Sequence, residues 1–228
     1  MNQKVILFDI NETVLNLSIL KGKFKIAFGD EGLMATWFSM LLHSSTVCIV
    51  TEVKSDFATL AKVMLESLAA RVGVKLSTAE LDDILASFAN LPPHEDIKPA
   101  LKKLNLAGFR LVAFSNSSLN LISAQITNAG LQEYFDDIIS VEETGSFKPD
   151  PNVYKFAAQK LNQPLDCLRL IASHDWDIHG ALSVGMQGAF INRSGAHYHK
   201  LYQQPDICAS SMENIVEQII VKDNQTVQ

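Results

Sequence analysis

The sequence predicts an α/β protein, with a Rossmann-like parallel sheet as its core and a mainly helical insertion after the first strand. Two patterns lead to this prediction. Short apolar runs alternate with helical patterns through the second half of the chain, and this alternation is typical of a parallel sheet with helices on both faces. Between residues 15 and 93 the alternation stops, and helical patterns follow one another instead.

The predicted strands are apolar runs that suit burial on both faces of a sheet. The first covers residues 4–9, with Val5 to Phe8 at its centre. Later runs cover residues 109–114, 168–172 and 188–191, and a weaker one covers 135–141. Helices are predicted between and after these strands, over residues 99–106, 119–129, 151–161 and 178–184 and from about 212. Asp150 and Pro151 fit a helix start, with aspartate as N-cap and proline at the first helical position.

The insertion divides the chain into two predicted domains. Its helical patterns cover residues 32–42, 55–72 and 78–89. Val47 to Val50 is a short β-branched run that fits either a strand or a link between helices. Leu91-Pro92-Pro93 closes the insertion. We therefore expect an α/β core domain made of residues 1–14 and 94–228, and a helical domain made of residues 15–93.

Composition restricts the classes of function. The chain has 228 residues, of which 47% are hydrophobic, enough for a core of ordinary size. Its net charge is −6 and no basic stripe is present, so nucleic acid is not an expected partner. We expect no apolar stretch long enough to span a membrane, and the first apolar run is too short for a signal peptide. Three cysteines without paired spacing indicate reduced thiols, and together these features predict a cytoplasmic protein.

Polar residues follow the predicted strands where active sites of parallel sheets lie. Asp9 ends the first strand, and Ser115-Asn116 follows the strand of residues 109–114. Lys148 lies in the loop before the helix that starts at Pro151, and residues 173–177 follow the strand of residues 168–172. A carboxylate, a hydroxyl-amide pair, a lysine and a second carboxylate therefore meet at one edge of the sheet.

Four motifs in order along the chain resemble those of the haloacid dehalogenase-like superfamily. Asp9-Ile10-Asn11-Glu12-Thr13 resembles its first motif, and Ser115-Asn116 its second. Lys148-Pro149-Asp150-Pro151 resembles the third. Residues 176–181, with 191–193 downstream, resemble the fourth motif of the L-2-haloacid dehalogenase (type II) branch. The match runs from about residue 4 to residue 193, and it implies that the helical segment 15–93 is the family's cap domain.

The resemblance implies a hydrolase whose nucleophile is Asp9. Such a carboxylate attacks an electrophilic carbon or phosphorus, and water then cleaves the resulting ester or acyl phosphate. Lys148 would keep Asp9 ionised and offset charge in the transition state. Asp177 would hold Lys148 or activate the hydrolytic water. Neutral hydrogen bonds that orient the carboxylate and substrate would come from Thr13, Ser115 and Asn116.

Two departures from the phosphatases of this superfamily favour attack at carbon. Those enzymes carry a second aspartate two residues after the nucleophile, where this chain has Asn11, and a further acid where it has Ser173. An amide cannot protonate a leaving alcohol, and Mg²⁺ prefers carboxylate ligands. A halide leaves without a proton and without Mg²⁺. We therefore expect no cofactor, and a small anionic substrate similar to a 2-haloacid.

Two alternatives stay open at this stage. One is a Mg²⁺-dependent phosphatase acting on a small phosphorylated metabolite, with Asp9, Asn11 and Asp177 as metal ligands and Asp175 as a further candidate. The other is a binding homologue that kept the fold without catalysis. Type II dehalogenases are often homodimers, so the resemblance also implies a homodimer, but no residue pattern in the sequence marks a dimer surface.

The resemblance also names substrate-binding candidates and one missing group. The candidates are Asn11, Tyr154 and His174, together with Trp37 and Phe38, which would line the pocket or, as is more common for apolar residues on a helix, belong to the core. His174 stands where the family has a water-orienting asparagine, and Tyr154 stands near the family's substrate carboxylate. Type II dehalogenases place a halide-binding arginine early in the cap, but the first arginine here is Arg71. The replacements we consider are Lys21, Lys23, Lys25 and His43, none of which has the planar fork of arginine.

Overall fold

The computed structural model describes residues 4–224 and contains one six-stranded parallel sheet. The strand order is β3-β2-β1-β4-β5-β6, and every adjacent pair is parallel. The strands are β1 (Val5–Phe8), β2 (Arg110–Ser115), β3 (Asp137–Ser140), β4 (Leu168–Ala172), β5 (Gln187–Ile191) and β6 (Ile207–Ala209). The predicted α/β class is therefore confirmed.

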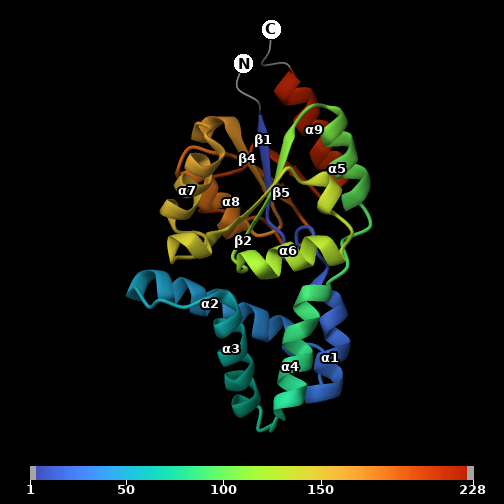
Figure 1. Cartoon of the computed structure of the whole chain (residues 1–228), viewed down its shortest axis with the longest axis vertical. Helices are drawn as coiled ribbons and strands as arrows, with labels where there is room; N and C mark the ends of the chain where they lie inside the picture. The colour runs from blue at the N-terminus through green and yellow to red at the C-terminus, as the bar shows by residue number, and fades with distance from the viewer. Residues whose placement is uncertain (1–3, 225–228) are drawn as a thin grey trace.

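Five of these strands lie where the apolar runs predicted them, with ends that differ by at most two residues. β6 was not predicted, because it is a three-residue edge strand whose middle residue, Cys208, is exposed. The four residues of β1 have no exposed surface, since β2 and β4 flank the strand and helices cover both faces of the sheet (Figure 1). Burial from both sides explains why the sequence of β1 is apolar throughout rather than alternating.

The core helices cover the two faces of the sheet. They are α5 (Ile97–Leu106), α6 (Leu119–Asn128), α7 (Pro151–Leu161), α8 (Asp175–Ser183) and α9 (Met212–Asn224). Figure 1 shows α5 and α9 together on one side of the sheet and α7 and α8 on the other. The side chain of Asp150 accepts a hydrogen bond from the backbone of Asn152, which confirms the predicted start of α7.

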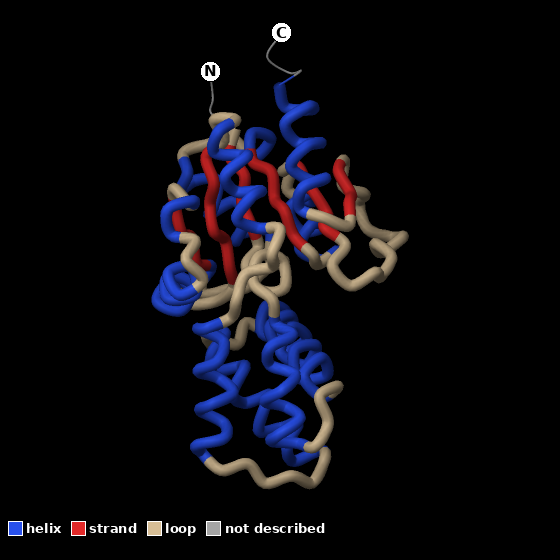
Figure 2. Tube along the Cα trace, turned by 90° about the vertical axis from the view of Figure 1, so that its right-hand side faces the viewer, coloured by secondary structure: helices blue, strands red, loops and turns tan. Residues whose placement is uncertain are grey.

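The residues between β1 and α5 form a helical layer beneath the sheet (Figure 2). Its helices are α1 (Leu20–Phe28), α2 (Leu33–Thr51), α3 (Phe57–Arg71) and α4 (Thr78–Ser87). Figure 2 shows strands only in the upper part of the molecule and helices below. α1 was not predicted, because only Leu20 and Phe24 of its nine residues are buried and the apolar pattern is sparse. Val47 to Val50 lies inside the single helix α2, so the strand and the link between helices are both wrong.

One expectation about membranes needs correction. Among the described residues, α2 is long and apolar enough to cross a membrane by length and composition. The expectation that no stretch reaches that length is therefore wrong. About a third of the apolar window is buried, and Trp37, Phe38 and Leu41 pack inside the helical layer. This packing gives α2 a structural reason for its apolar sequence.

The two segments that join the helical layer to the core run side by side. The backbone of Asn16 donates to the carbonyl of Pro92 at 2.8 Å, and the backbone of His94 donates to that of Val14 at 3.0 Å. Leu15 forms an antiparallel bridge with Pro93. This double connection lies a few residues after the end of β1, so it fixes the helical layer over the carboxyl ends of the strands.

Candidate active site

The predicted site residues gather where the strand order changes direction, between β1 and β4. Asp9 follows β1, and its backbone donates to the carbonyl of Ile171 in β4 at 3.0 Å. Ser173 and His174 follow β4, and Ser115 ends β2 on the other side of β1. In open parallel sheets the crevice at such a switch point is the usual binding position.

Asp9 is a buried carboxylate held by donors on both of its oxygens. It is 7% exposed. Thr13 Oγ1 donates to Asp9 Oδ2 at 2.7 Å, and Lys148 Nζ donates to Asp9 Oδ1 at 3.2 Å. Burial opposes ionisation, but Lys148, His174 and Thr13 outweigh it and lower the pKa of Asp9 to about 2. Asp9 is therefore an oriented carboxylate that stays ionised at neutral pH.

Lys148 is a buried cation that joins two carboxylates. It is 1% exposed, and Nζ donates to Asp177 Oδ2 and to the carbonyl of Phe114, each at 2.9 Å, as well as to Asp9. Asn116 Oδ1 accepts from the backbone of Lys148 at 2.9 Å and so positions the lysine. Burial opposes its charge, but Asp177 and Asp9 raise the pKa of Lys148. The lysine therefore remains charged beside Asp9.

Asp177 has no exposed surface and faces Lys148 rather than solvent. Besides Lys148, it accepts a hydrogen bond of 2.7 Å from the hydroxyl of Tyr154 at Oδ1. Burial raises the pKa of Asp177, Lys148 opposes that shift, and the charge of Asp9 adds to it. With both oxygens occupied, Asp177 is arranged to hold Lys148, which was one of the two roles expected for it.

His174 lies between two carboxylates at the start of α8. Its Nε2 is 2.8 Å from Glu12 Oε2, and its Nδ1 is 3.4 Å from Asp9 Oδ2. The ring stacks on Trp176 with centroids 5.2 Å apart and lies 6.2 Å from the ring of Phe38. Burial opposes its charge, but the contacts with Asp9 and Glu12 and their charges raise the pKa of His174 to about 10. The imidazolium is therefore the stable form while Asp9 is ionised.

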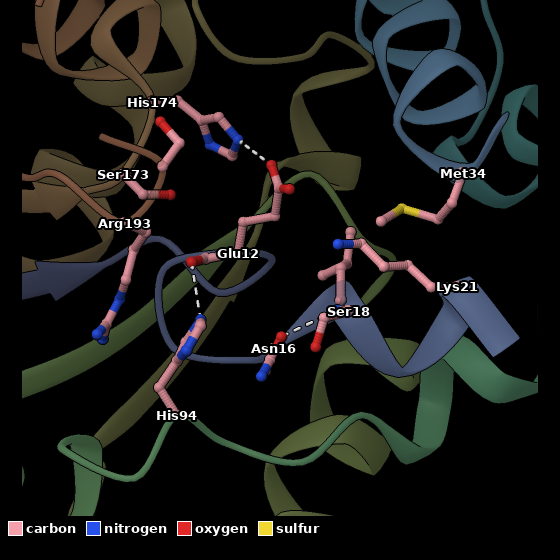
Figure 3. A pocket seen from close by; sticks show the side chains of 11 residues that line it. Glu12, Asn16, Ser18, Lys21, Met34, His94, Ser173, His174 and Arg193 are labelled. Carbon is pink, nitrogen blue, oxygen red and sulfur yellow. Dashed lines mark hydrogen bonds and ion pairs between the residues drawn. The ribbon is translucent and has the colours of Figure 1, made fainter. Parts of the chain in front are cut away.

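Glu12 is a site residue that sequence reasoning missed. Its φ is 65°, in the left-handed region that glycine tolerates best. The signal in the sequence was a second carboxylate three residues after Asp9. Its significance depends on a backbone turn that the sequence does not reveal. That turn directs the side chain toward His174, as Figure 3 shows.

Glu12 and His174 line a cavity of about 310 Å³ between the core and the helical layer. Asp9 is not among its lining residues, so His174 is the contact between this cavity and the nucleophile. Lys21 of α1 also lines it, whereas Lys23 pairs with Asp83 and Lys25 donates to the carbonyl of Gly29. Of the four replacements considered for the missing arginine, only Lys21 lines this cavity.

Two further basic residues reach the cavity from the core. Arg193 donates to the carbonyl of Thr13 at 3.1 Å and pairs with Asp96 at 2.8 Å. His94 Nε2 lies 3.1 Å from the carbonyl of Glu12. Both residues thus support the loop that carries Glu12 and Thr13. Arg193 follows β5, so its place at the carboxyl edge was available from the sequence.

Several predicted site residues lie elsewhere than expected. Trp37 has no exposed surface and donates to the carbonyl of Ala61 at 2.9 Å, so it belongs to the interior of the helical layer. Tyr154 is also fully buried, behind Asp177. Neither can touch a substrate in this conformation. Phe38, at 5% exposed, reaches His174 from α2.

Asn11 and Ser115 are buried near Asp9 but serve local structure. Asn11 Nδ2 donates to Ser117 Oγ at 3.4 Å, and its Oδ1 accepts from Gln125 at 3.2 Å. Gln125 in turn donates to the carbonyl of Phe88 in the helical layer. Ser115 Oγ accepts from the backbone of Ser117 at 3.1 Å. Asn11 is therefore linked to the helical layer through Gln125, and neither of these two hydrogen bonds of its side chain reaches Asp9.

The side chains near Asp9 do not fit the Mg²⁺ site of the phosphatase alternative. Asn11 bonds to Ser117 and Gln125, and both oxygens of Asp177 are held by Lys148 and Tyr154. Asp175 accepts from the backbone of Trp176. Among residues 4–224, no three His, Cys, Asp or Glu side chains are grouped as metal ligands. Mg²⁺ needs several oxygen ligands, and these occupied side chains do not supply them.

Comparisons with known proteins agree with this geometry. The family model described as haloacid dehalogenase-like hydrolase matches residues 3–185. An (S)-2-haloacid dehalogenase of Pseudomonas sp. (strain YL) is 27% identical over 216 residues, which are 94% of this chain and 93% of that protein.

Solved structures share the fold. An L-2-haloacid dehalogenase from Xanthobacter autotrophicus, with chloropropionic acid covalently bound, has a TM-score of 0.88 at 20% identity and covers 96% of this chain and 98% of its own. A HAD phosphatase from Thermococcus onnurineus has a lower TM-score of 0.61, also at 20% identity, over 95% and 97% of the two chains.

Proposed function

The chain belongs to the haloacid dehalogenase-like hydrolases, and from this premise we propose that it is a dehalogenase that hydrolyses a small 2-haloacid. Asp9 attacks the carbon that bears the halogen, and the halide leaves with the bonding electrons. The product of this step is an ester between Asp9 and the substrate. Water then attacks the ester carbonyl, so that a 2-hydroxyacid is released and the carboxylate of Asp9 returns.

The observation that carries this proposal is the arrangement around Asp9. Thr13 and Lys148 hold its two oxygens at 2.7 and 3.2 Å, so the carboxylate is oriented before substrate arrives. Orientation of this kind lowers the barrier because the reacting groups need not be ordered during the reaction. The buried charge of Lys148 also stabilises the oxyanion that forms when water attacks the ester.

A leaving group that needs no proton suits this site. The position that supplies a leaving-group acid in related phosphatases is Asn11, and its amide is bonded to Ser117 and Gln125. Halide departs without protonation, so this arrangement favours attack at carbon over attack at phosphorus. The (S)-2-haloacid dehalogenase of Pseudomonas sp. (strain YL), which aligns over most of the chain, supports the same substrate class.

The helical layer serves in this proposal as the cap that holds the substrate anion. Lys21 lines the cavity beside Glu12 and His174, and among the described residues no ion pair or hydrogen bond of its side chain is found. An ammonium can bind a carboxylate or a halide as a point charge, though without the two-pronged geometry of arginine. Phe38 adds an apolar surface next to His174.

The test is product release from the purified protein. Chloride and bromide are measured from each enantiomer of the 2-halopropionates, and phosphate from an aryl phosphate, each with Mg²⁺ and with EDTA. We expect halide release that persists in EDTA and falls by about 10⁴-fold in Asp9→Asn. Phosphate release that depends on Mg²⁺, with no halide from any 2-haloacid, would refute the proposal and favour the phosphatase alternative.

A further inference from the structure

His174 and Glu12 form a pair beside Asp9 that the reaction outlined above does not use. The Nδ1 atom of His174 lies 3.4 Å from Asp9 Oδ2, and the Nε2 atom of the same ring lies 2.8 Å from Glu12 Oε2. Its Nδ1 is buried and has no hydrogen-bond partner among residues 4–224, because its contact with Asp9 is close but not aligned. Because Nδ1 faces the reacting carboxylate, a proton on this nitrogen can be exchanged there once Asp9 is no longer charged.

We propose that His174 is the general base that activates the hydrolytic water in the second half of the reaction, with Glu12 as the residue that positions it. This inference rests on the proposed function, since it concerns the hydrolysis of the ester on Asp9. The oxygen that Nδ1 faces is Asp9 Oδ2, which becomes part of the ester group. A water bound by Nδ1 would therefore lie within reach of the ester carbonyl.

Glu12 determines which nitrogen of the ring is basic. A carboxylate 2.8 Å from Nε2 holds a proton on that nitrogen. When the imidazolium loses one proton, the proton on Nδ1 leaves, and the lone pair then faces Asp9. The φ of 65° at Glu12 brings its carboxylate to this position.

The charge change at Asp9 couples the two halves of the reaction. In the resting state both Asp9 and Glu12 stabilise the imidazolium and raise the pKa of His174. Once Asp9 becomes a neutral ester, only Glu12 still does so, and the pKa of His174 falls. The other groups at the site are the cations Lys21 and Arg193 and the half-buried His94, which line the cavity, and Lys148 on the far side of Asp9. None of them adds negative charge to replace that of Asp9.

Protons are balanced over one complete turnover. Ester formation releases the halide, and His174 then loses its Nδ1 proton to solvent through the cavity. The attacking water gives a proton to Nδ1 while its oxygen bonds to the carbonyl carbon of Asp9. Collapse breaks the bond to the substrate oxygen, which takes the proton from His174. The carboxylic acid left on Asp9 returns its proton to His174, so the net products are hydroxyacid, halide and one proton.

Asp177 is the competing base, and its contacts disfavour it. Its two oxygens accept from Lys148 and Tyr154, and it has no exposed surface. To activate water it would have to give up one of these buried hydrogen bonds. His174 is 14% exposed and lines the cavity, which gives its proton a route to solvent.

The test separates the two half-reactions in His174→Asn. We expect a burst of one halide per protein chain, followed by ester hydrolysis slowed by about 10²- to 10⁴-fold, with the ester adduct seen by mass spectrometry of the intact protein. The burst also reports that the variant is folded. His174→Gln is measured in parallel, and His197→Asn, on an exposed loop, is the matched control that keeps wild-type kinetics.

Glu12→Gln tests the positioning role through the pH midpoint of ester hydrolysis, which a purely structural role of Glu12 would leave unchanged. Loss of its charge lowers the pKa of His174 in the ester, so the pH midpoint of ester hydrolysis shifts down by about one unit. If the wild type turns over but His174→Asn hydrolyses its ester at the wild-type rate, or shows no burst while folded, this inference is wrong and the proposed function stands. If the wild type releases no halide, the proposed function and this inference about His174 are both wrong.

Discussion

Two groups of charged residues meet at Asp9, and they differ in burial and in what surrounds them. The inner group is Asp9, Lys148 and Asp177, which have between 0% and 7% exposed surface and bond mainly to one another. The cavity group is Glu12, Lys21, His94 and Arg193, which line the space between the core and the helical layer. His174 contacts both Asp9 and Glu12.

The inner group consists of residues that match the superfamily motifs, and the cavity group contains Lys21, one of the residues considered in place of the family's cap arginine. In the proposed reaction Asp9 of the inner group forms the covalent bond. The same residues would therefore act on any substrate that the protein binds. The cavity group would contact the substrate and leave the bond-forming atoms alone. Under the proposed function, the difference separates the residues that form and break bonds from those that contact the substrate, and variants of the two groups can test that division.

The largest effect is expected from Lys148→Met. This change leaves two buried carboxylates, Asp9 and Asp177, without their cation, so we expect the free energy of unfolding to fall by about 3 kcal/mol. Urea denaturation measures it. Lys103→Met is the matched control, since Lys103 forms an exposed pair with Glu217, and we expect a change within about 0.5 kcal/mol. An equal loss of unfolding free energy in the two variants would show that the buried inner group is no more important for stability than a surface ion pair.

The second prediction concerns the dependence of stability on pH. Because the pKa of His174 is raised from 6.5 to about 10, its stabilisation is fully present below pH 6.5 and is lost as pH rises through about 10. The free energy of unfolding of the wild type should therefore fall over this range more steeply than that of His174→Asn. Denaturation at several pH values gives both curves. Parallel curves would show that His174 is not held as a cation between Asp9 and Glu12.

Backbone strain at Glu12 gives a smaller effect. Glu12→Gly and Glu12→Gln both remove the carboxylate, but only glycine fits a φ of 65° without strain. We expect Glu12→Gly to be about 1 kcal/mol more stable than Glu12→Gln, after allowing for the entropy of glycine in the unfolded chain. Equal stabilities in thermal denaturation would mean that the turn at Glu12 carries no strain.

The smallest effect belongs to the cavity group. Lys21→Met should raise KM for a 2-haloacid about fivefold and leave kcat unchanged, because an exposed ammonium attracts the substrate anion modestly and does not touch the reacting bond. Steady-state kinetics measure both constants. Lys23→Met is the control, since Lys23 pairs with Asp83 outside this cavity and should behave as wild type. A fall in kcat without a change in KM would mean that Lys21 takes part in the reaction together with the inner group.

The inner group could be predicted from the sequence because its residues follow strands. Asp9 follows an apolar run, and because the carboxyl ends of parallel strands meet at one edge, the polar residues that follow the other runs could be expected near it. The cavity group could be predicted only in part. Lys21 was one of four candidates from the sequence and Arg193 follows β5, but which side chains face the cavity depends on side-chain direction. The relevance of Glu12 comes from a left-handed turn, and the interior place of Trp37 comes from packing against Phe24 and Phe88. An apolar helical stripe looks the same whether it faces a pocket or a core.

The most direct test of the central role, Asp9 as nucleophile, is a single turnover in water enriched in heavy oxygen, with enzyme in excess over a 2-halopropionate. In an ester mechanism the first product molecule takes its new oxygen from the carboxylate of Asp9, and the water oxygen enters Asp9. We predict unlabelled hydroxyacid and a heavy-oxygen label in the peptide that contains Asp9. Labelled hydroxyacid with an unlabelled Asp9 peptide would mean that water attacks the substrate directly, and would contradict the assignment of Asp9 as nucleophile.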